Sequence, residues 1–141
     1  MSDLEIPQVL IDIREKEMSA NINVNDMEPT GGFLSGFIEA SVEMPPDGSN
    51  GECIVHYGGK HNRCEMMVTM VNGAREGEAV IVNDGIPFLR LEYQRGSLTG
   101  IVERMNKYGL LDMRGHLENG VETGLFVEYD ENDKVVWIGY Y

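Results

Sequence analysis

The residues best suited to chemistry lie in one short segment, which holds both cysteines and two of the three histidines. These residues are Cys53, His56, His61 and Cys64. The order Cys-x2-His followed by His-x2-Cys is similar to the ligand pattern of tetrahedral zinc sites, and two neighbouring thiols also suit redox chemistry. A small zinc or redox module is therefore one functional hypothesis for this chain.

The turn inside this segment argues against a zinc site. The glycine pair at 58–59 predicts a two-residue hairpin turn, which would place His56 opposite His61 and Cys53 opposite Cys64. Because positions 53 and 56 differ by an odd number, their side chains would point to opposite faces of the sheet. One ion could then reach all four ligands only if a β-bulge interrupted the hairpin. We therefore expect ordinary cross-strand pairs, with no metal, no cofactor and no disulfide.

No other group of side chains in the sequence has the pattern of a catalytic site. Carboxylates are numerous, but none stands in an apolar setting that would tune an acid or a base. The acidic turn 130–133 lacks the twelve-residue loop of a calcium site, and no glycine-rich segment continues into the Lys-Ser or Lys-Thr of a phosphate loop. We therefore expect a protein that is not an enzyme.

Composition narrows the choice of partner. The chain has 141 residues and a net charge of −13, with only 11 lysines and arginines. This charge disfavours nucleic acid and anionic membranes, both of which need basic side chains, and favours a protein partner with a basic surface. Two cysteines make no disulfide framework, and neither a signal peptide nor an apolar membrane span is recognisable. We expect a cytoplasmic protein.

Three glycine pairs recur at steps of 23 and 24 residues, namely Gly73 and Gly77, Gly96 and Gly100, and Gly120 and Gly124. A fixed period in this range is typical of repeat arrays. The positions three, five and seven residues before each first glycine are never polar, whereas the positions between them mostly are. Such alternation predicts β-strands with one buried face. The buried positions would be Met66, Val68, Met70, Leu89, Leu91, Tyr93, Met113, Gly115 and Leu117.

The turns between these strands complete the predicted architecture. They are expected at Asn83-Asp84-Gly85, at 106–109 and at 130–133, and the glycine pairs would link one hairpin to the next. We therefore predict an all-β protein, an antiparallel meander of consecutive hairpins that forms an elongated or half-rolled single sheet. The hairpin array would span residues 31–141, and residues 1–30 would form an acidic N-terminal extension.

The glycine pattern resembles that of MORN repeats in their divergent variant. The likeness rests on Gly115-His-Leu117-Glu-Asn-Gly120-Val-Glu-Thr-Gly124, on the related run 91–100, and on Gly139-Tyr140-Tyr141. It covers about residues 51–141, and more weakly 31–50, where the run 31–36 looks like a first degenerate copy. The chain departs from the family two residues after each pair, where Ala79, Val102 and Phe126 replace a further glycine.

The resemblance implies an elongated, twisted meander that serves protein association. Arrays of this family dimerise or act as scaffolds, and phosphoinositide binding has been proposed for some of them. We therefore expect a protein–protein interaction module, either scaffold or adaptor, which could also form a homodimer. A phosphoinositide-binding, membrane-associated module is the alternative, although the acidic charge makes membrane binding unfavourable.

The last strand is the best candidate for partner binding in the sequence. Its residues are apolar on both faces, and as the end of the array it would present an open edge that invites pairing with another chain. The alternative is that the N-terminal segment folds back over this edge. The candidate partner-binding residues are Val136, Trp137, Ile138, Tyr140 and Tyr141.

Overall fold

The computed structural model describes residues 24–26 and 32–141, and within them it is an all-β protein. Most of the predicted extension 1–30 lies outside the described residues. In chain order the elements are β1 (Val24–Asp26), β2 (Ile38–Glu43), β3 (Gly51–Gly58), the short 3-10 helix η1 (Gly59–His61), β4 (Cys64–Val71), β5 (Ala74–Asn83), β6 (Ile86–Gln94), β7 (Ser97–Leu98), β8 (Gly100–Met105), β9 (Leu111–Glu118), β10 (Val121–Tyr129) and β11 (Val135–Tyr140).

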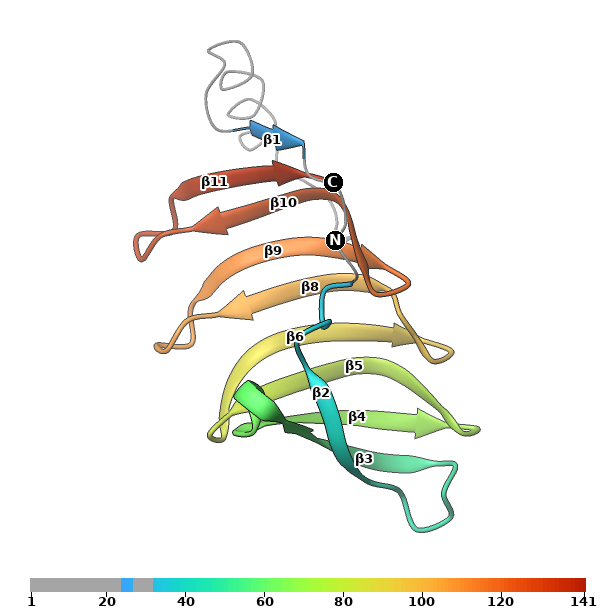
Figure 1. The fold of residues 1–141 in the computed structure, drawn as a ribbon. Helices are drawn as coiled ribbons and strands as arrows, with labels where there is room; N and C mark the ends of the chain where they lie inside the picture. Colours follow the sequence, from blue (N-terminus) through green and yellow to red (C-terminus); the bar gives the residue numbers. More distant parts are fainter. Residues whose placement is uncertain (1–23, 27–31) are drawn as a thin grey trace.

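The strands form one sheet of eleven strands, in the order β1-β11-β10-β9-β8-β6-β5-β4-β3-β2, with β7 paired to β6 (Figure 1). From β2 to β11 the strands pair antiparallel in chain order, except that β6 pairs with both the two-residue β7 and β8, and this order confirms the predicted meander. β1 is the exception, because it pairs in parallel with β11. Both ends of the meander are therefore formed with strands from the N-terminal part of the chain.

Tight turns explain why the strands follow one another in this order. Asn72 and Gly73 have φ angles of 52° and 82°, and Asn119 and Gly120 have 51° and 80°. Positive φ at both central residues defines the type I′ turn, whose twist matches that of paired strands. The first glycine of each pair thus lies in a hairpin turn itself, rather than in a link between separate hairpins.

The second glycine of each pair lies where the strand pairing slips. Gly77, Gly100 and Gly124 all have positive φ, and register shifts interrupt the pairing of β5 and β10 beside them. At Gly100 the carboxylate of Glu92 accepts the N–H of Ile101 at 3.2 Å and so replaces a bond of the ladder. Bulges bend strands and increase their twist, so their recurrence in successive hairpins gives the sheet its curvature.

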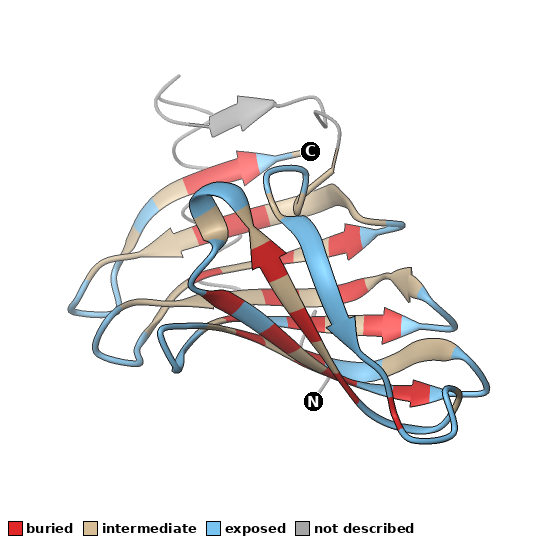
Figure 2. Ribbon diagram, turned by 60° about the horizontal axis from the view of Figure 1, so that its bottom comes forward, coloured by how far each residue is buried: buried red, intermediate tan, exposed pale blue. Residues whose placement is uncertain are grey.

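The hydrophobic core lies on one face of the curved sheet, which we call the inner face. Its most deeply buried side chains include Met66, Ile81, Leu91 and Leu117. All nine positions that the alternation assigned to a buried face are buried, which confirms that prediction. Figure 2 shows buried segments within strands across the sheet, whereas the turns are mostly exposed.

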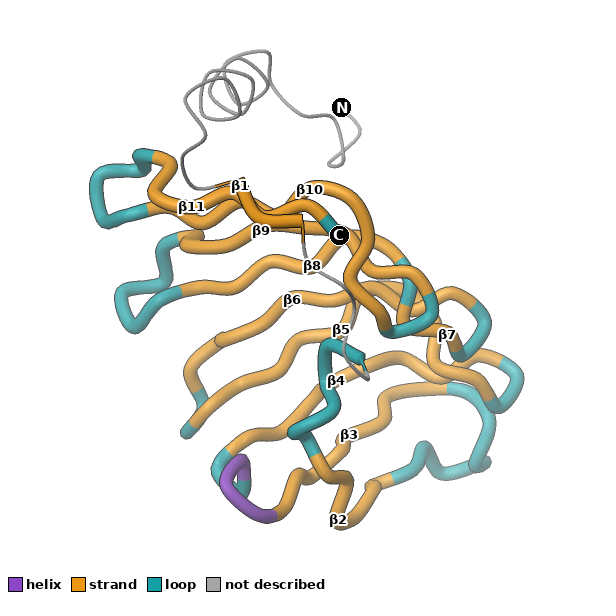
Figure 3. Tube along the Cα trace, turned by 45° about the horizontal axis from the view of Figure 1, so that its top comes forward, coloured by secondary structure: helices purple, strands orange, loops and turns teal. Residues whose placement is uncertain are grey.

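Residues 32–37 lie across the inner face and cover part of the core (Figures 1 and 3). The N–H of Phe33 donates to the carbonyl of Gly120 at 2.7 Å, and the Phe33 and Phe126 rings lie 6.5 Å apart. Phe37 contacts Tyr57 edge-on at 5.3 Å. The run 31–36, whose sequence looks like a degenerate copy of the glycine pair, packs over its described residues as a cover on the core.

Within residues 24–26 and 32–141, no helix is long and apolar enough to cross a membrane.

Candidate functional site

The cysteines and histidines of the candidate zinc segment do not converge. Cys53 and Cys64 are both buried as free thiols in the core of the inner face. His56 lies on the opposite, outer face, where its Nε2 contacts the Glu43 carboxylate and its Nδ1 lies 3.8 Å from Glu65. No three His, Cys, Asp or Glu side chains among the described residues are grouped so that they could hold a metal ion.

The register predicted for this hairpin is wrong. Cys53 pairs with Val68 and His56 pairs with Glu65, because η1 and the residues after it lengthen the turn. Val68 lies four residues from Cys64 along β4, which separates the two cysteines by about 13 Å at ~3.3 Å per residue. That span exceeds the reach of a disulfide, whose Cα atoms lie roughly 4.4–6.8 Å apart. His61 instead stacks on Phe37, with 3.8 Å between ring centres.

Burial raises the pKa of both thiols above the ordinary range. A thiol of raised pKa is a poor nucleophile and a poor metal ligand at neutral pH, because only the thiolate reacts or ligates. Cys53 and Cys64 are therefore suited to core packing.

The last strand, β11, is not the edge of the sheet, because β1 pairs with it from Val24–Ile138 to Asp26–Tyr140. The structure thus favours the alternative in which N-terminal residues cover this edge. Of the candidate partner-binding residues, Trp137 and Tyr141 pack against the core and Ile138 is fully buried. Val136 and Tyr140 remain exposed, at 56% and 43%.

Among the described residues the sheet has two edge strands, the three-residue β1 and, at the other end, the six-residue β2. β2 pairs with β3 on one side only, and every one of its residues is exposed (Figure 2). Ile38, Val42 and the following Met44 are large apolar residues with exposures of 65%, 38% and 50%. The backbone groups on the free side of such a strand can pair with another strand.

The open edge is anchored by an ion pair that reaches over the inner face. Glu39 of β2 accepts two hydrogen bonds from the Arg75 guanidinium, at 2.8 and 2.9 Å, and the guanidinium also lies over the Tyr93 ring. The hydrogen bond from Arg75 lowers the pKa of Glu39, even though partial burial opposes this. Bidentate pairs of this kind fix geometry as well as charge. β2 is thus tied to β5 as well as to β3.

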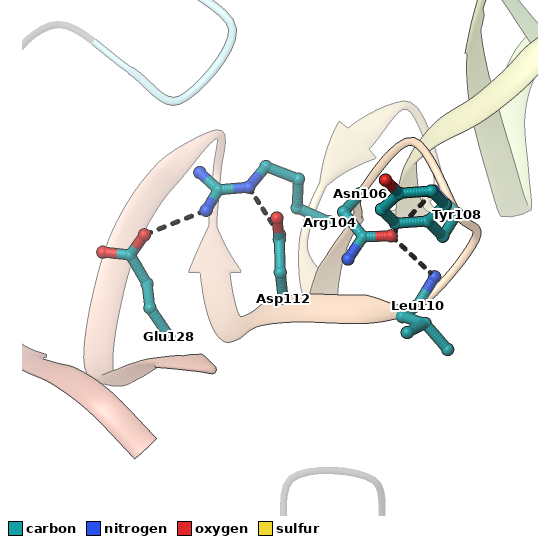
Figure 4. A network of polar contacts seen from close by, with 6 residues as sticks. All are labelled: Arg104, Asn106, Tyr108, Leu110, Asp112 and Glu128. Atoms are coloured by element: carbon teal, nitrogen blue, oxygen red, sulfur yellow. Dashed lines mark hydrogen bonds and ion pairs between the residues drawn. The ribbon is translucent and has the colours of Figure 1, made fainter. Parts of the chain in front are cut away.

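A second feature is a shallow pocket of about 280 Å³ between the turns that follow β5 and β8. Ile86, Phe88 and Met105 supply apolar walls, and Arg104 lies at the rim. Arg104 donates to Asp112 at 2.7 Å and to Glu128 at 2.9 Å (Figure 4). Because ligand pockets usually measure roughly 300–1,000 Å³, this one suits a single side chain better than a metabolite.

The hydrogen-bonding network around Arg104 neutralises the positive charge of its guanidinium group. Partial burial opposes the charged form, but the hydrogen bonds to Asp112 and Glu128 outweigh it and raise the pKa of Arg104. In the adjoining turn the Asn106 side chain accepts the N–H groups of Tyr108 and Leu110 (Figure 4). Since both carboxylates already neutralise the guanidinium, we assign this cluster to holding β8, β9 and β10 in place.

β2 is not among the candidate binding elements predicted from the sequence, although the sequence contains a signal for this strand. Ile38, Ala40, Val42 and Met44 alternate with polar residues, which is typical of a strand.

No protein-family model, no curated protein and no solved structure matches this chain.

Proposed function

We propose that this chain is a non-enzymatic protein-association module, a scaffold or adaptor of the cytoplasm built as a divergent MORN-like array. The observation that carries the proposal is the open edge strand β2, with the exposed side chains of Ile38, Val42 and Met44. An extended segment of a partner protein adds to such an edge through backbone hydrogen bonds, while pockets for alternate side chains supply specificity.

Features of β2 itself suit a selective partner. A bulge between Glu39 and Ser41 interrupts its pairing with β3. Bulges and charged side chains blunt indiscriminate pairing at sheet edges. A partner strand therefore has to match both the bulge and the exposed carboxylate of Glu43, and a segment carrying lysine or arginine meets the second condition. This agrees with the preference for basic partners that the net charge of −13 indicates.

A homodimer is the second form of the proposal. Val136 and Tyr140 are exposed next to the junction of β11 with β1, and a second copy could pack against them. Light scattering over a wide concentration range distinguishes the two forms. If the chain dimerises through β11, replacing Val136 and Tyr140 with lysine makes it monomeric, whereas association through β2 is unchanged by this variant.

The test of the main proposal uses lysines as blocking residues on β2. The variant Ile38→Lys with Val42→Lys should fold normally, because both side chains are exposed. This variant should no longer capture the partner protein that the wild type captures from native lysate, and quantitative mass spectrometry measures the captured amount. Ile86→Lys is the control, since Ile86 is 53% exposed at the start of β6, and β5, β4 and β3 separate it from β2. Equal capture by the β2 variant and the wild type would refute association through β2.

A further inference from the structure

The outer face of strands β3, β4 and β5 carries an apolar row that is separate from the open edge. Ile54, Met67 and Val80 are direct cross-strand partners, so their side chains stand side by side on the face opposite the core. All of them are half-buried, and none belongs to the core cluster. Because neighbouring strands lie about 4.8 Å apart, the row is roughly 10 Å long.

Glutamates border this row. Glu43 continues it onto β2 as the partner of Ile54, while Glu52, Glu65 and Glu78 lie two residues along their strands from members of the row. Each of these carboxylates reaches solvent, with side-chain exposures of 63% for Glu43, 48% for Glu65 and 62% for Glu78. An apolar strip is thus framed by negative charge.

Little positive charge offsets these carboxylates. His56 lies between Glu43 and Glu65, and Arg90, the partner of Val80 on β6, lies 3.5 Å from Glu78. Arg90 is also held by Glu103 at 3.1 Å, so its charge is shared. The outer face of β3–β5 therefore keeps a net negative charge around apolar side chains.

From these observations we infer that the outer face of β3–β5 binds a basic amphipathic segment of a partner protein. Apolar side chains of the segment cover Ile54, Met67 and Val80, and its lysines or arginines pair with the bordering glutamates. The inference goes beyond the proposed function, because this surface is a sheet face and binding to it requires no added strand at β2.

Charge complementarity selects this occupant over the others. A second copy of the chain brings a further charge of −13, and nucleic acid or an anionic membrane would place like charges together. A neutral apolar segment would cover the row but leave the glutamates facing apolar atoms, and burying charge without a partner is unfavourable. A segment that alternates apolar and basic residues satisfies both parts of the surface.

The test uses the full chain and three synthetic nine-residue peptides labelled with a fluorophore. The first alternates lysine and leucine, the second lysine and serine, and the third glutamate and leucine. Fluorescence anisotropy should show that the lysine–leucine peptide binds at least tenfold more tightly than either other peptide. Its binding should weaken with added salt, because salt screens exposed charge pairs. Equal binding of the lysine–serine peptide, or no binding of the lysine–leucine peptide, would overturn the inference.

Two matched variants locate the binding. Replacing Glu52, Glu65 and Glu78 with glutamine should weaken binding of the lysine–leucine peptide at least tenfold. The control variant removes the same number of negative charges elsewhere. The exposed residues Glu118 and Glu131 are replaced with glutamine, and the exposed residue Asp133 with asparagine. This control variant should weaken binding less than threefold. If both variants weaken binding equally, the attraction is only the general charge of the protein and the inference fails.

A third variant tests the apolar part and separates this inference from the proposed function. Met67→Ser should weaken binding of the lysine–leucine peptide about fivefold while leaving partner capture through β2 intact. The variant with lysine at Ile38 and Val42 should lose partner capture through β2 but keep its binding of the lysine–leucine peptide. If the peptide binding is lost with the β2 variant and kept with Met67→Ser, the inference is overturned and the proposal for β2 stands.

Discussion

The close approach of Phe126 to Gly115 gives the sharpest stability prediction. Both residues lie on the inner face, at the bulge between β9 and β10. A Cβ atom added at Gly115 would lie 2.4 Å from two carbons of the Phe126 ring. Because carbon atoms pack about 3.5–4.0 Å apart, the ring would have to move by more than ~1 Å. We therefore expect Gly115→Ala to disrupt the core at this point.

The size of the effect follows from two opposing contributions. The Phe126 ring has Tyr141 at 5.0 Å and Phe33 at 6.5 Å, which limit its movement. Overpacking of this kind typically costs about 1–3 kcal/mol. Replacing a strand glycine with alanine returns roughly 0.5–1 kcal/mol, because the unfolded chain loses freedom. The free energy of unfolding should therefore fall by about 1–2 kcal/mol.

Urea unfolding followed by the fluorescence of Trp137, the one tryptophan, measures this change. Gly58→Ala is the matched control, because it lies in a strand and its added Cβ would meet Ala40 at an acceptable 3.4 Å. The control should raise the free energy of unfolding by about 0.5–1 kcal/mol, because alanine restricts the unfolded chain and meets no clash at this position. In a Phe126→Leu background, Gly115→Ala should be less destabilising than alone. Equal stability of Gly115→Ala and wild type would refute the packing described here.

Three further predictions concern the ion pair, the thiols and zinc. Because the pKa of Glu39 is lowered, its contribution to stability is present above the unfolded pKa and is lost as pH falls through the folded pKa. Glu39→Gln should therefore be less stable than wild type at pH 7 in urea unfolding, and the difference should shrink as pH is lowered through the acid range. A constant difference would contradict the pairing with Arg75. Cys53 and Cys64 should react with a thiol reagent at pH 8 only as fast as the protein opens, so rapid labelling of either in the native state would show that the core is not closed over it. Elemental analysis should find no stoichiometric zinc, and added zinc should leave the melting temperature unchanged; an increase of several degrees would restore the zinc hypothesis.

Much of the fold was predictable because it is encoded locally. The alternation that places Met113 and Leu117 inward and His116 outward requires only the two-residue period of a strand. The turns at Asn72-Gly73 and Asn119-Gly120 follow from residues that tolerate positive φ. Both signals lie within a few residues of the feature that they determine, and tertiary contacts reinforce them.

The errors arose where distant contacts decide the outcome. At Gly58-Gly59 the local signal favoured a two-residue turn, but only Gly59 has positive φ, and a longer turn places His61 against Phe37. The parallel pairing of β1 with β11 joins residues more than a hundred positions apart, and its pattern is too short to recognise in the sequence. Local patterns therefore reveal neither that β1 covers the edge of β11 nor that β2 lies at the opposite edge.

The proposed function requires that a partner protein binds at β2. Amide hydrogen exchange of β2, with and without the protein captured by the wild type, tests this most directly. We predict that the amides of Ile38–Glu43 exchange at least tenfold more slowly in the complex, because the open side of the strand becomes hydrogen-bonded. Unchanged exchange in β2, with new protection confined to β8–β11, would contradict the account.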